Sequence, residues 1–199
     1  GSFARPEIAA RGALLDYVEL TQVGRMPALQ TPRRVATGAA MAIDAATRAN
    51  LELMKTLKGE SKGSLFSTID RTVTGAGARE LGARLAAPLT DPYAINQRLD
   101  AVECFAEARD LRTRLRAELR AAPDMARALT RLSLGRGGPR DLAAIRDGLG
   151  AAHALAQLLD QAHPSLLPLP KEIADTADAL RSVAAALRDR LAHMLAQDL

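Results

Sequence analysis

The sequence has 199 residues, a net charge of +4 and a charged fraction of 25%, values that suit a globular chain with one domain or two small lobes. Its single cysteine, Cys104, excludes an intramolecular disulfide within these residues. Because the sequence has no long apolar run, we expect neither a membrane span nor an opening signal peptide. We therefore expect a cytoplasmic protein in a reducing compartment. Gly1-Ser2 resembles a remnant of cloning, so we also expect a piece of a longer protein.

The composition favours helices. Alanine, leucine, arginine and glutamate are frequent, whereas aromatic residues make up only 3% of the chain, and this balance is typical of α-helical proteins. A basic net charge is compatible with a polyanionic partner. The excess of arginine over lysine is also typical of a GC-rich genome, and we favour this second explanation.

The N-terminal part predicts one helix followed by irregular structure. The helix is expected to span Pro6 to about Gln22, because proline suits a first helical turn and Gly24 can end the helix. A loop with two prolines follows. Residues 34–43 are predicted to hold at most a very short β-hairpin.

Helix starts can be read from capping residues, because Asp, Ser and Thr side chains accept an unpaired N–H of the first turn. The predicted caps are Asp44, Ser64, Thr74, Asp91 and Asp124. The helix after Asp44 is expected to reach Leu57. Residues 58–63 are expected to form a solvent-exposed tip rather than a phosphate loop, since no Gly-Lys-Ser/Thr follows. Prolines at 88 and 123 are expected to end helices.

Apolar residues recur at helical spacing in the middle of the chain. One stripe consists of Ile95, Leu99, Val102 and Ala106, and a second of Leu111, Leu115 and Leu119. Cys104 is expected to point away from the first stripe. The helix after Asp124 is expected to turn Met125, Leu129 and Leu132 inward.

Long helices are predicted for the C-terminal part. One runs from Pro139 to about Gln161, and its inward residues are Leu142, Ile145, Leu149, Ala152, Leu155 and Leu159. After a proline-rich break, a last helix is expected to run unbroken from Lys171 to the end of the chain, roughly 40 Å. Its heptad seam consists of Ile173, Leu180, Leu187 and Met194, with Ala177, Ala184 and Leu191 between them. The predicted fold class is all-α.

Several segments together resemble the MutS family of DNA mismatch-repair proteins. They are residues 12–22, 44–52, 64–74, 79–85, 88–89, 98–102, 123–136 and 139–142. Their order and spacing agree with that family, and the resemblance covers most of residues 12–150. One departure is Ala49, where the family often has an arginine, and the last fifty residues match by helical character alone.

The resemblance implies a multi-helix core with long lever helices. It divides the chain into a linker helix leading out of a connector domain (residues 1–33), a helical core (34–160) and the start of the long lever helix (161–199). In the family, such levers join a C-terminal ATPase domain to a clamp that grips DNA. The implied role is mechanical, because rigid helices can transmit nucleotide state to the DNA grip.

The resemblance also implies the partners and cofactors of the parent protein. The partners are the remaining MutS domains (connector, clamp and ATPase), mismatched duplex DNA, a second MutS subunit and a MutL-type protein, with no membrane. The parent is expected to be a DNA-dependent ATPase that uses ATP and Mg. The piece itself lacks Gly-x-x-x-x-Gly-Lys-Ser/Thr, and we expect in it neither the family's mismatch-reading Phe-x-Glu wedge nor enzymatic activity.

Other side chains could form sites, but we favour a structural explanation for each. Asp44, Arg48 and Asn50 are expected to cap a helix and bond neighbouring helices. An arginine stripe could touch phosphates, yet acidic residues dilute it and no aromatic residue is interleaved, so we expect a solvated face. The stripe comprises Arg112, Arg116 and Arg120, with Arg109 and Arg114 beside it.

Metal-binding and nucleophilic sites are not expected. The histidines are His153, His163 and His193. None has a cysteine or carboxylate at metal-ligand spacing. Cys104 has no histidine near it in sequence, and Asp175 and Asp178 carry no sign of a cleft. We therefore expect no catalytic, cofactor-binding or metal-binding residue in this piece.

Two alternatives to the family role stay open. The chain could be a stand-alone basic helical DNA-binding or scaffold module, and tight binding that weakens steeply with salt would favour this. It could also be an unrecognised hydrolase, which a negative ATPase assay would exclude.

Overall fold

The chain is all-α, as the sequence predicts. A computed structural model describes residues 3–22, 26, 29, 31–32, 40–162, 168–183 and 185–195. The helices are α1 (Arg5–Thr21), α2 (Ala45–Asn50), α3 (Leu65–Ile69), α4 (Gly75–Ala86), α5 (Pro92–Glu107), α6 (Arg109–Ala121), α7 (Met125–Ser133), α8 (Pro139–Ala162), α9 (Lys171–Arg181) and α10 (Ala185–Met194). Within the described ranges, β-pairing is limited to one isolated antiparallel bridge, between Ala40 and Leu89.

All the capping predictions are confirmed. Each cap side chain accepts a backbone N–H in the first turn of its helix, and the capping residues are Asp44, Ser64, Thr74, Asp91 and Asp124. The prolines also act as expected, because α4 ends at Ala86 and α6 at Ala121. Gly24 and residues 34–39 of the predicted hairpin lie outside the described residues.

Helix α2 is shorter than predicted, since it ends at Asn50 and not near Leu57. The backbone turns at Glu52, which has a φ of 48°. The carbonyl groups of Glu52 and Leu53 then accept the N–H groups of Leu65 and Phe66, at 3.0 and 2.9 Å. Leu53 is buried, with 5% of its surface exposed. Pairing with a distant segment and burial of Leu53 therefore take the place of further helical turns.

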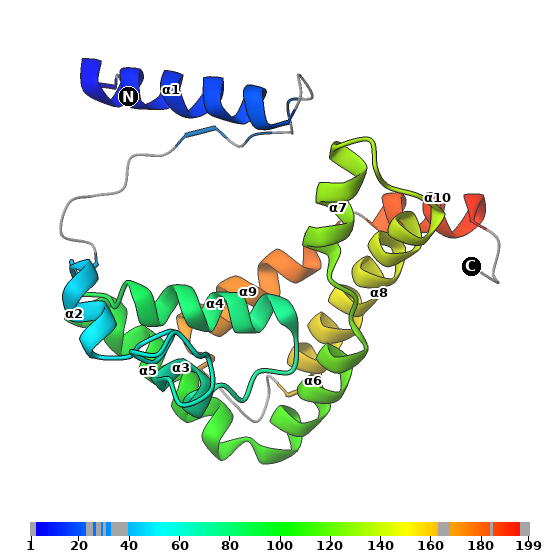
Figure 1. Cartoon of the computed structure of the whole chain (residues 1–199). Helices are drawn as coiled ribbons and strands as arrows, with labels where there is room; N and C mark the ends of the chain where they lie inside the picture. Colours follow the sequence, from blue (N-terminus) through cyan, green and yellow to red (C-terminus); the bar gives the residue numbers. More distant parts are fainter. Residues whose placement is uncertain are drawn as a thin grey trace.

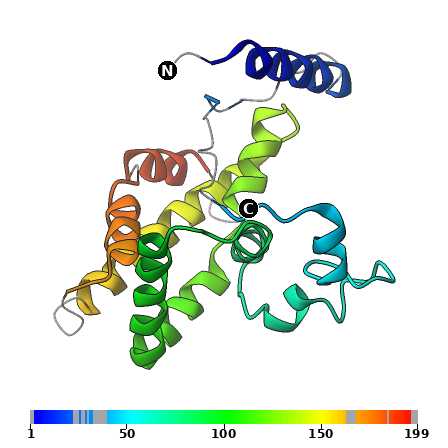
Figure 2. The same cartoon turned by 90° about the vertical axis from the view of Figure 1, so that its left-hand side faces the viewer.

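A bundle around α8 forms the centre of the molecule (Figures 1 and 2). Helices α6, α7, α9 and α10 all pack against α8, and α5 packs against α6 and α9. The main core cluster consists of Ala101, Cys104, Leu111, Leu115, Leu155, Leu159, Ile173 and Ala177. Figure 2 shows α2 and α3 on one side of the molecule, opposite the bundle. The inward residues predicted for α6 and α8 are buried or half-buried, as expected.

The buried face of α5 is not the predicted stripe. Leu99 and Val102 are 56% and 63% exposed, whereas Ala101 and Cys104 are buried. The helix is apolar on two faces, and α6 and α9 cover the face of Ala101 and Cys104. Similarly, Leu129 on α7 is 61% exposed, because α7 turns the neighbouring Ala128 into the bundle.

The last helix is broken rather than continuous. Helix α9 ends at Arg181, and α10 begins at Ala185; both pack on α8. The hydroxyl of Ser182 donates to the Ala179 carbonyl at 2.8 Å, and such a back-bond competes with the helical ladder and bends helices. Of the predicted seam, Ile173 and Leu191 are buried, whereas Leu187 and Met194 are 45% and 69% exposed and Ala184 lies outside the described residues.

Helix α1 lies apart from the bundle in Figure 1 and has no buried residue. Its bounds agree with the prediction to within one residue at each end, and Pro6 occupies its first turn. None of the described helices is both long enough and apolar enough to cross a membrane.

Candidate functional site

Helix α8 is the longest of the described helices and the one best suited to act as a rigid rod. It has 24 residues, which corresponds to a rod of about 36 Å. Its buried residues are Ala143, Gly148, Leu149, Leu155, Ala156 and Leu159. Four helices pack against it, and packed side chains resist displacement of the helix that they contact.

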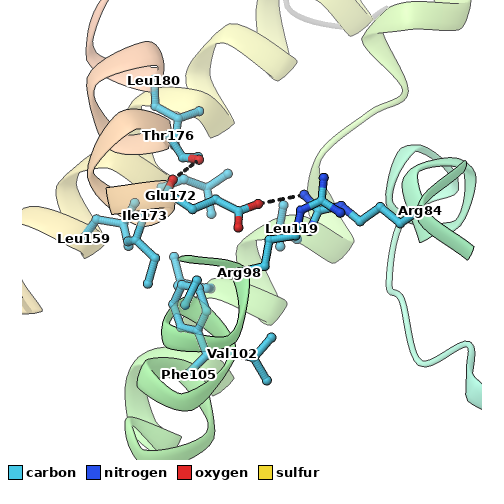
Figure 3. Close-up of a pocket in the computed structure, with 13 residues that line it drawn as sticks. Arg84, Arg98, Val102, Phe105, Leu119, Leu159, Glu172, Ile173, Thr176 and Leu180 are labelled. Atoms are coloured by element: carbon cyan, nitrogen blue, oxygen red, sulfur yellow. Dashed lines mark hydrogen bonds and ion pairs between the residues drawn. The ribbon is translucent and has the colours of Figure 1, made fainter. Parts of the chain in front are cut away.

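Helix α4 is joined to this bundle by arginine–carboxylate pairs. Arg79 of α4 donates two hydrogen bonds to Asp124 at the start of α7, both 3.0 Å long. Arg84 donates to Glu172 of α9 at 2.8 Å (Figure 3), and it also donates to Glu80 within α4 at 2.8 Å. The Arg79 hydrogen bond holds the pKa of Asp124 below its ordinary value. We call these two contacts the polar joint. Exposed ion pairs of this kind contribute little free energy individually, so the polar joint determines where α4 lies more than it stabilises the fold.

The arginine stripe of α6 is used within the fold. Arg112 donates to the carbonyl oxygens of Phe105 and Ala106, at 2.6 and 3.0 Å, at the C-terminal end of α5. Arg116 donates to the Arg71 carbonyl at 2.9 Å. A third member, Arg114, donates to the side-chain oxygen of Gln161 at 3.1 Å. These contacts cap free carbonyls and connect helices. Arg112 and Arg116 are half-buried, so the predicted solvated face is wrong for these two arginines. Arg109, Arg114 and Arg120 are exposed, as predicted.

Asp44 and Arg48 also have structural roles, as predicted. Asp44 accepts from the backbone N–H and the hydroxyl of Thr47, at 2.9 and 2.7 Å, and these bonds lower its pKa. Arg48 donates to the Ala86 carbonyl at 3.2 Å, so it connects α2 to the last turn of α4. Asn50 is exposed at the end of α2.

The histidines are dispersed. His153 bonds Gln157 one helical turn away, at 3.1 Å, His193 is exposed on α10, and His163 lies outside the described residues. Within the described ranges, no three histidine, cysteine or carboxylate side chains come together in a group that could hold a metal ion.

Cys104 is buried in the core. Burial is the main cause that raises the pKa of its thiol, and the neighbouring Glu107 adds to it, so the reactive thiolate is disfavoured. The two carboxylates considered on α9 are both in ion pairs: Asp175 bonds Lys171 and Asp178 bonds Arg181, each at 2.5 Å.

One sequence expectation needs correction. A Phe-x-Glu sequence does occur in the chain, at Phe105 and Glu107. Phe105 lies near the C-terminal end of α5 and packs against the core cluster, so its ring is held inside the fold. The motif therefore does not provide an exposed wedge.

Comparison with known proteins gives one consistent result. The family model for MutS domain III matches residues 46–198. A protein of Rhodopseudomonas palustris (strain HaA2) is 58% identical over 198 residues, and one of Rhizobium meliloti (strain 1021) is 50% identical over 199; each alignment covers 100% of this chain and 21% of the relative. A protein of Caulobacter sp. (strain K31) is 48% identical over 197 residues, which covers 99% of this chain and 22% of the relative. All three are named DNA mismatch repair protein MutS, and this chain spans about a fifth of their length.

Proposed function

Because this chain belongs to the MutS family, with domain III matched over residues 46–198, we propose that it is the core and lever part of a bacterial DNA mismatch-repair protein. In that role it couples an ATPase domain to a DNA clamp, both contributed by other parts of the parent polypeptide. The parts are a linker helix from a connector domain (1–33), the helical core (34–160) and the start of the lever (161–199).

The observation that supports the proposal is the packing of four helices around α8. A 24-residue helix, α8, is packed on by α6, α7, α9 and α10. A closely packed bundle of this kind moves as a body instead of deforming continuously. It can therefore pass a displacement from one end to the other, which is what coupling between nucleotide and DNA requires.

ATP and Mg are proposed cofactors of the parent, and the residues present here do not fit them. The sequence has no phosphate-loop motif, and the described part holds no cluster of metal ligands. We therefore propose that this piece is not itself an enzyme and that ATP hydrolysis belongs to another domain. Mismatched DNA, a second subunit, a MutL-type partner and a cytoplasmic location are proposed for the parent on the same family grounds.

The test uses the full-length mismatch-repair protein that carries this segment. Leu155, which is 9% exposed in α8, is replaced by alanine to loosen the packing of the rod at a cost of about 2–5 kcal/mol. We expect the basal ATPase rate and the nucleotide-free affinity for mismatched DNA to stay near wild type. DNA stimulation of the ATPase and ATP-triggered release of DNA should both fall severalfold, because each requires transmission through the bundle.

The matched control is Leu129→Ala on α7, since Leu129 is 61% exposed and its shortening leaves the packing intact. If Leu155→Ala lowers stability but leaves both coupled activities at their wild-type level, α8 does not transmit the signal and the proposal is wrong. Tight, steeply salt-dependent DNA binding by residues 1–199 alone would instead favour the DNA-binding module.

A further inference from the structure

Lysine is concentrated in one loop of this chain. The sequence has 23 arginines but only four lysines, and three of the four are Lys55, Lys58 and Lys62. No arginine occurs between Arg48 and Arg71, so a preference of the genome for arginine codons does not explain this stretch. Lysine carries its charge as a compact ammonium group on a flexible stem, which can follow a carboxylate that is not held in one geometry.

The loop that carries these lysines is ordered by its own hydrogen bonds. We call residues 55–63 the lysine loop. The Thr56 N–H donates to the Glu60 carbonyl, and the Gly59 N–H donates to the Thr56 carbonyl, both at 2.8 Å. Gly59 and Gly63 have φ angles of 82° and 96°, in the left-handed region that favours glycine. A loop that is already ordered loses little conformational entropy when it binds a partner.

The lysine loop presents its positive charge to solvent. Residues 57–63 are all exposed, as predicted for the tip, and Lys55 is exposed as well. Within the described ranges, the only lysine in an ion pair is Lys171, which bonds Asp175. Glu60 is the one carboxylate of the loop. Figure 2 shows the segment between α2 and α3 at the edge of the molecule, opposite the bundle, so a partner can approach the loop without displacing another helix of this chain.

A hollow of about 680 Å³ lies between the lysine loop and α2. Its apolar lining includes Ile43 and Leu57, and its cationic lining consists of Arg48 and Lys55. No carboxylate is among the described residues that line it. The Arg48 guanidinium donates to the carbonyl oxygens of Ile43 and Ala86, at 3.3 and 3.2 Å, and these neutral acceptors leave its charge in place. The hollow therefore combines an apolar surface with uncompensated positive charge.

We propose that the lysine loop binds a short acidic segment of a partner protein. One large apolar side chain of that segment enters the hollow against Leu57, which is 72% exposed, and its carboxylates pair with the lysines. A nucleic-acid backbone fits less well, because phosphodiester groups do not fill an apolar hollow and the loop has no aromatic side chain for base stacking. This binding role goes beyond the coupling proposed for the bundle and does not depend on it.

Peptide binding to residues 1–199 and to the full-length protein is the first test. The probe is a short fluorescent peptide of aspartate and glutamate with central leucines, and its control carries serine in place of each leucine. Binding is followed by fluorescence anisotropy at several salt concentrations. We expect the leucine peptide to bind both proteins about tenfold more tightly than the serine peptide, because only leucine buries apolar surface in the hollow. Affinity for both peptides should fall as salt screens the lysines.

Substitutions in the loop are the second test. Lys55→Glu should weaken binding of the leucine peptide severalfold, and the triple charge reversal at positions 55, 58 and 62 should weaken it by about tenfold or more. Lys171→Glu on α9 makes the same change of charge as Lys55→Glu and is the matched control, with an affinity expected to stay near wild type. Leu57→Ser should remove the preference for leucine over serine. Circular dichroism checks that each variant is folded, which is expected because the substituted loop residues are exposed.

Equal affinity for the leucine and serine peptides overturns the inference, and so does an equal loss of affinity in Lys55→Glu and Lys171→Glu. Binding by residues 1–199 that is absent from the full-length protein also overturns it, because the loop is then covered in the parent. A duplex DNA probe that binds residues 1–199 and is weakened by the triple charge reversal, when the leucine peptide is not, would assign the loop to nucleic acid instead. None of these outcomes bears on the coupling assay, which measures packing around α8.

Discussion

Replacing glycine by alanine is expected to have opposite effects on stability at two positions near the middle of α8, Gly148 and Gly150. A Cβ added at Gly150 meets no atom within 4 Å, whereas at Gly148 it would lie 2.2 Å from both the Cγ and the Sδ of Met125. Replacing glycine by alanine inside a helix stabilises by about 0.5–1 kcal/mol. Overpacking a filled site costs about 1–3 kcal/mol. We therefore expect Gly150→Ala to stabilise the chain by about 0.5–1 kcal/mol and Gly148→Ala to destabilise it by about 1–2 kcal/mol.

The two variants are compared by urea unfolding of residues 1–199, followed by far-ultraviolet circular dichroism. Midpoint shifts of opposite sign at constant m-value are expected, together with changes in Tm of about 2–4 °C per kcal/mol. In a Met125→Ala background the Cγ and Sδ are gone, so Gly148→Ala should become neutral or stabilising. Two outcomes would refute the packing assigned to α7 and α8. One is a stability change of the same sign at both glycines, and the other is a Gly148→Ala variant that is still destabilised in the Met125→Ala background.

Three further predictions concern single side chains. Ser64 is fully buried and its hydroxyl accepts the Ser67 N–H at 3.2 Å, so Ser64→Ala should cost about 1–2 kcal/mol in urea unfolding; a cost near zero would contradict the cap. Arg79 holds the pKa of Asp124 below its ordinary value, so the stabilisation from Asp124 is present at neutral pH and is lost as pH falls below about 4. The stability difference between wild type and Asp124→Asn should therefore shrink in acid, and a difference that grows there would be inconsistent. Burial raises the pKa of Cys104, which predicts slow reaction of the native thiol at neutral pH and fast reaction in urea; equal rates in both would argue against its burial.

Helix starts could be predicted because capping is local. A side chain and the N–H it accepts lie two or three residues apart, as for Thr74 and Gly77, so both are visible in the sequence. Helix ends depend more on distant partners. Helix α2 stops at Asn50 because Glu52 and Leu53 bond the segment at Leu65 and Phe66, and nothing within residues 44–57 indicates that pairing.

The polar joint could not be predicted from spacing. Arg79 and Asp124 are 45 positions apart, and Arg84 and Glu172 are 88 apart. Charged residues on helix surfaces are common, so no pattern singles out these two pairs. The family resemblance supplied the fold and the domain identity, but the way α4 meets α7 and α9 emerges only from the packing of the whole chain.

Helix α5 shows why a failed prediction of burial can still be informative. Its sequence has two apolar faces: Ala101, Cys104 and Phe105 pack in the core, whereas Leu99 and Val102 are largely exposed. A helix that is apolar on two faces is normally covered on both sides, and the described part of the chain covers only one side of α5. The exposed face borders a hollow that residues of α4, α5 and α9 line, Arg98 among them. Periodicity therefore identifies both apolar faces of α5, but which of them is buried depends on the helices that pack beside it, and spacing alone does not reveal those helices.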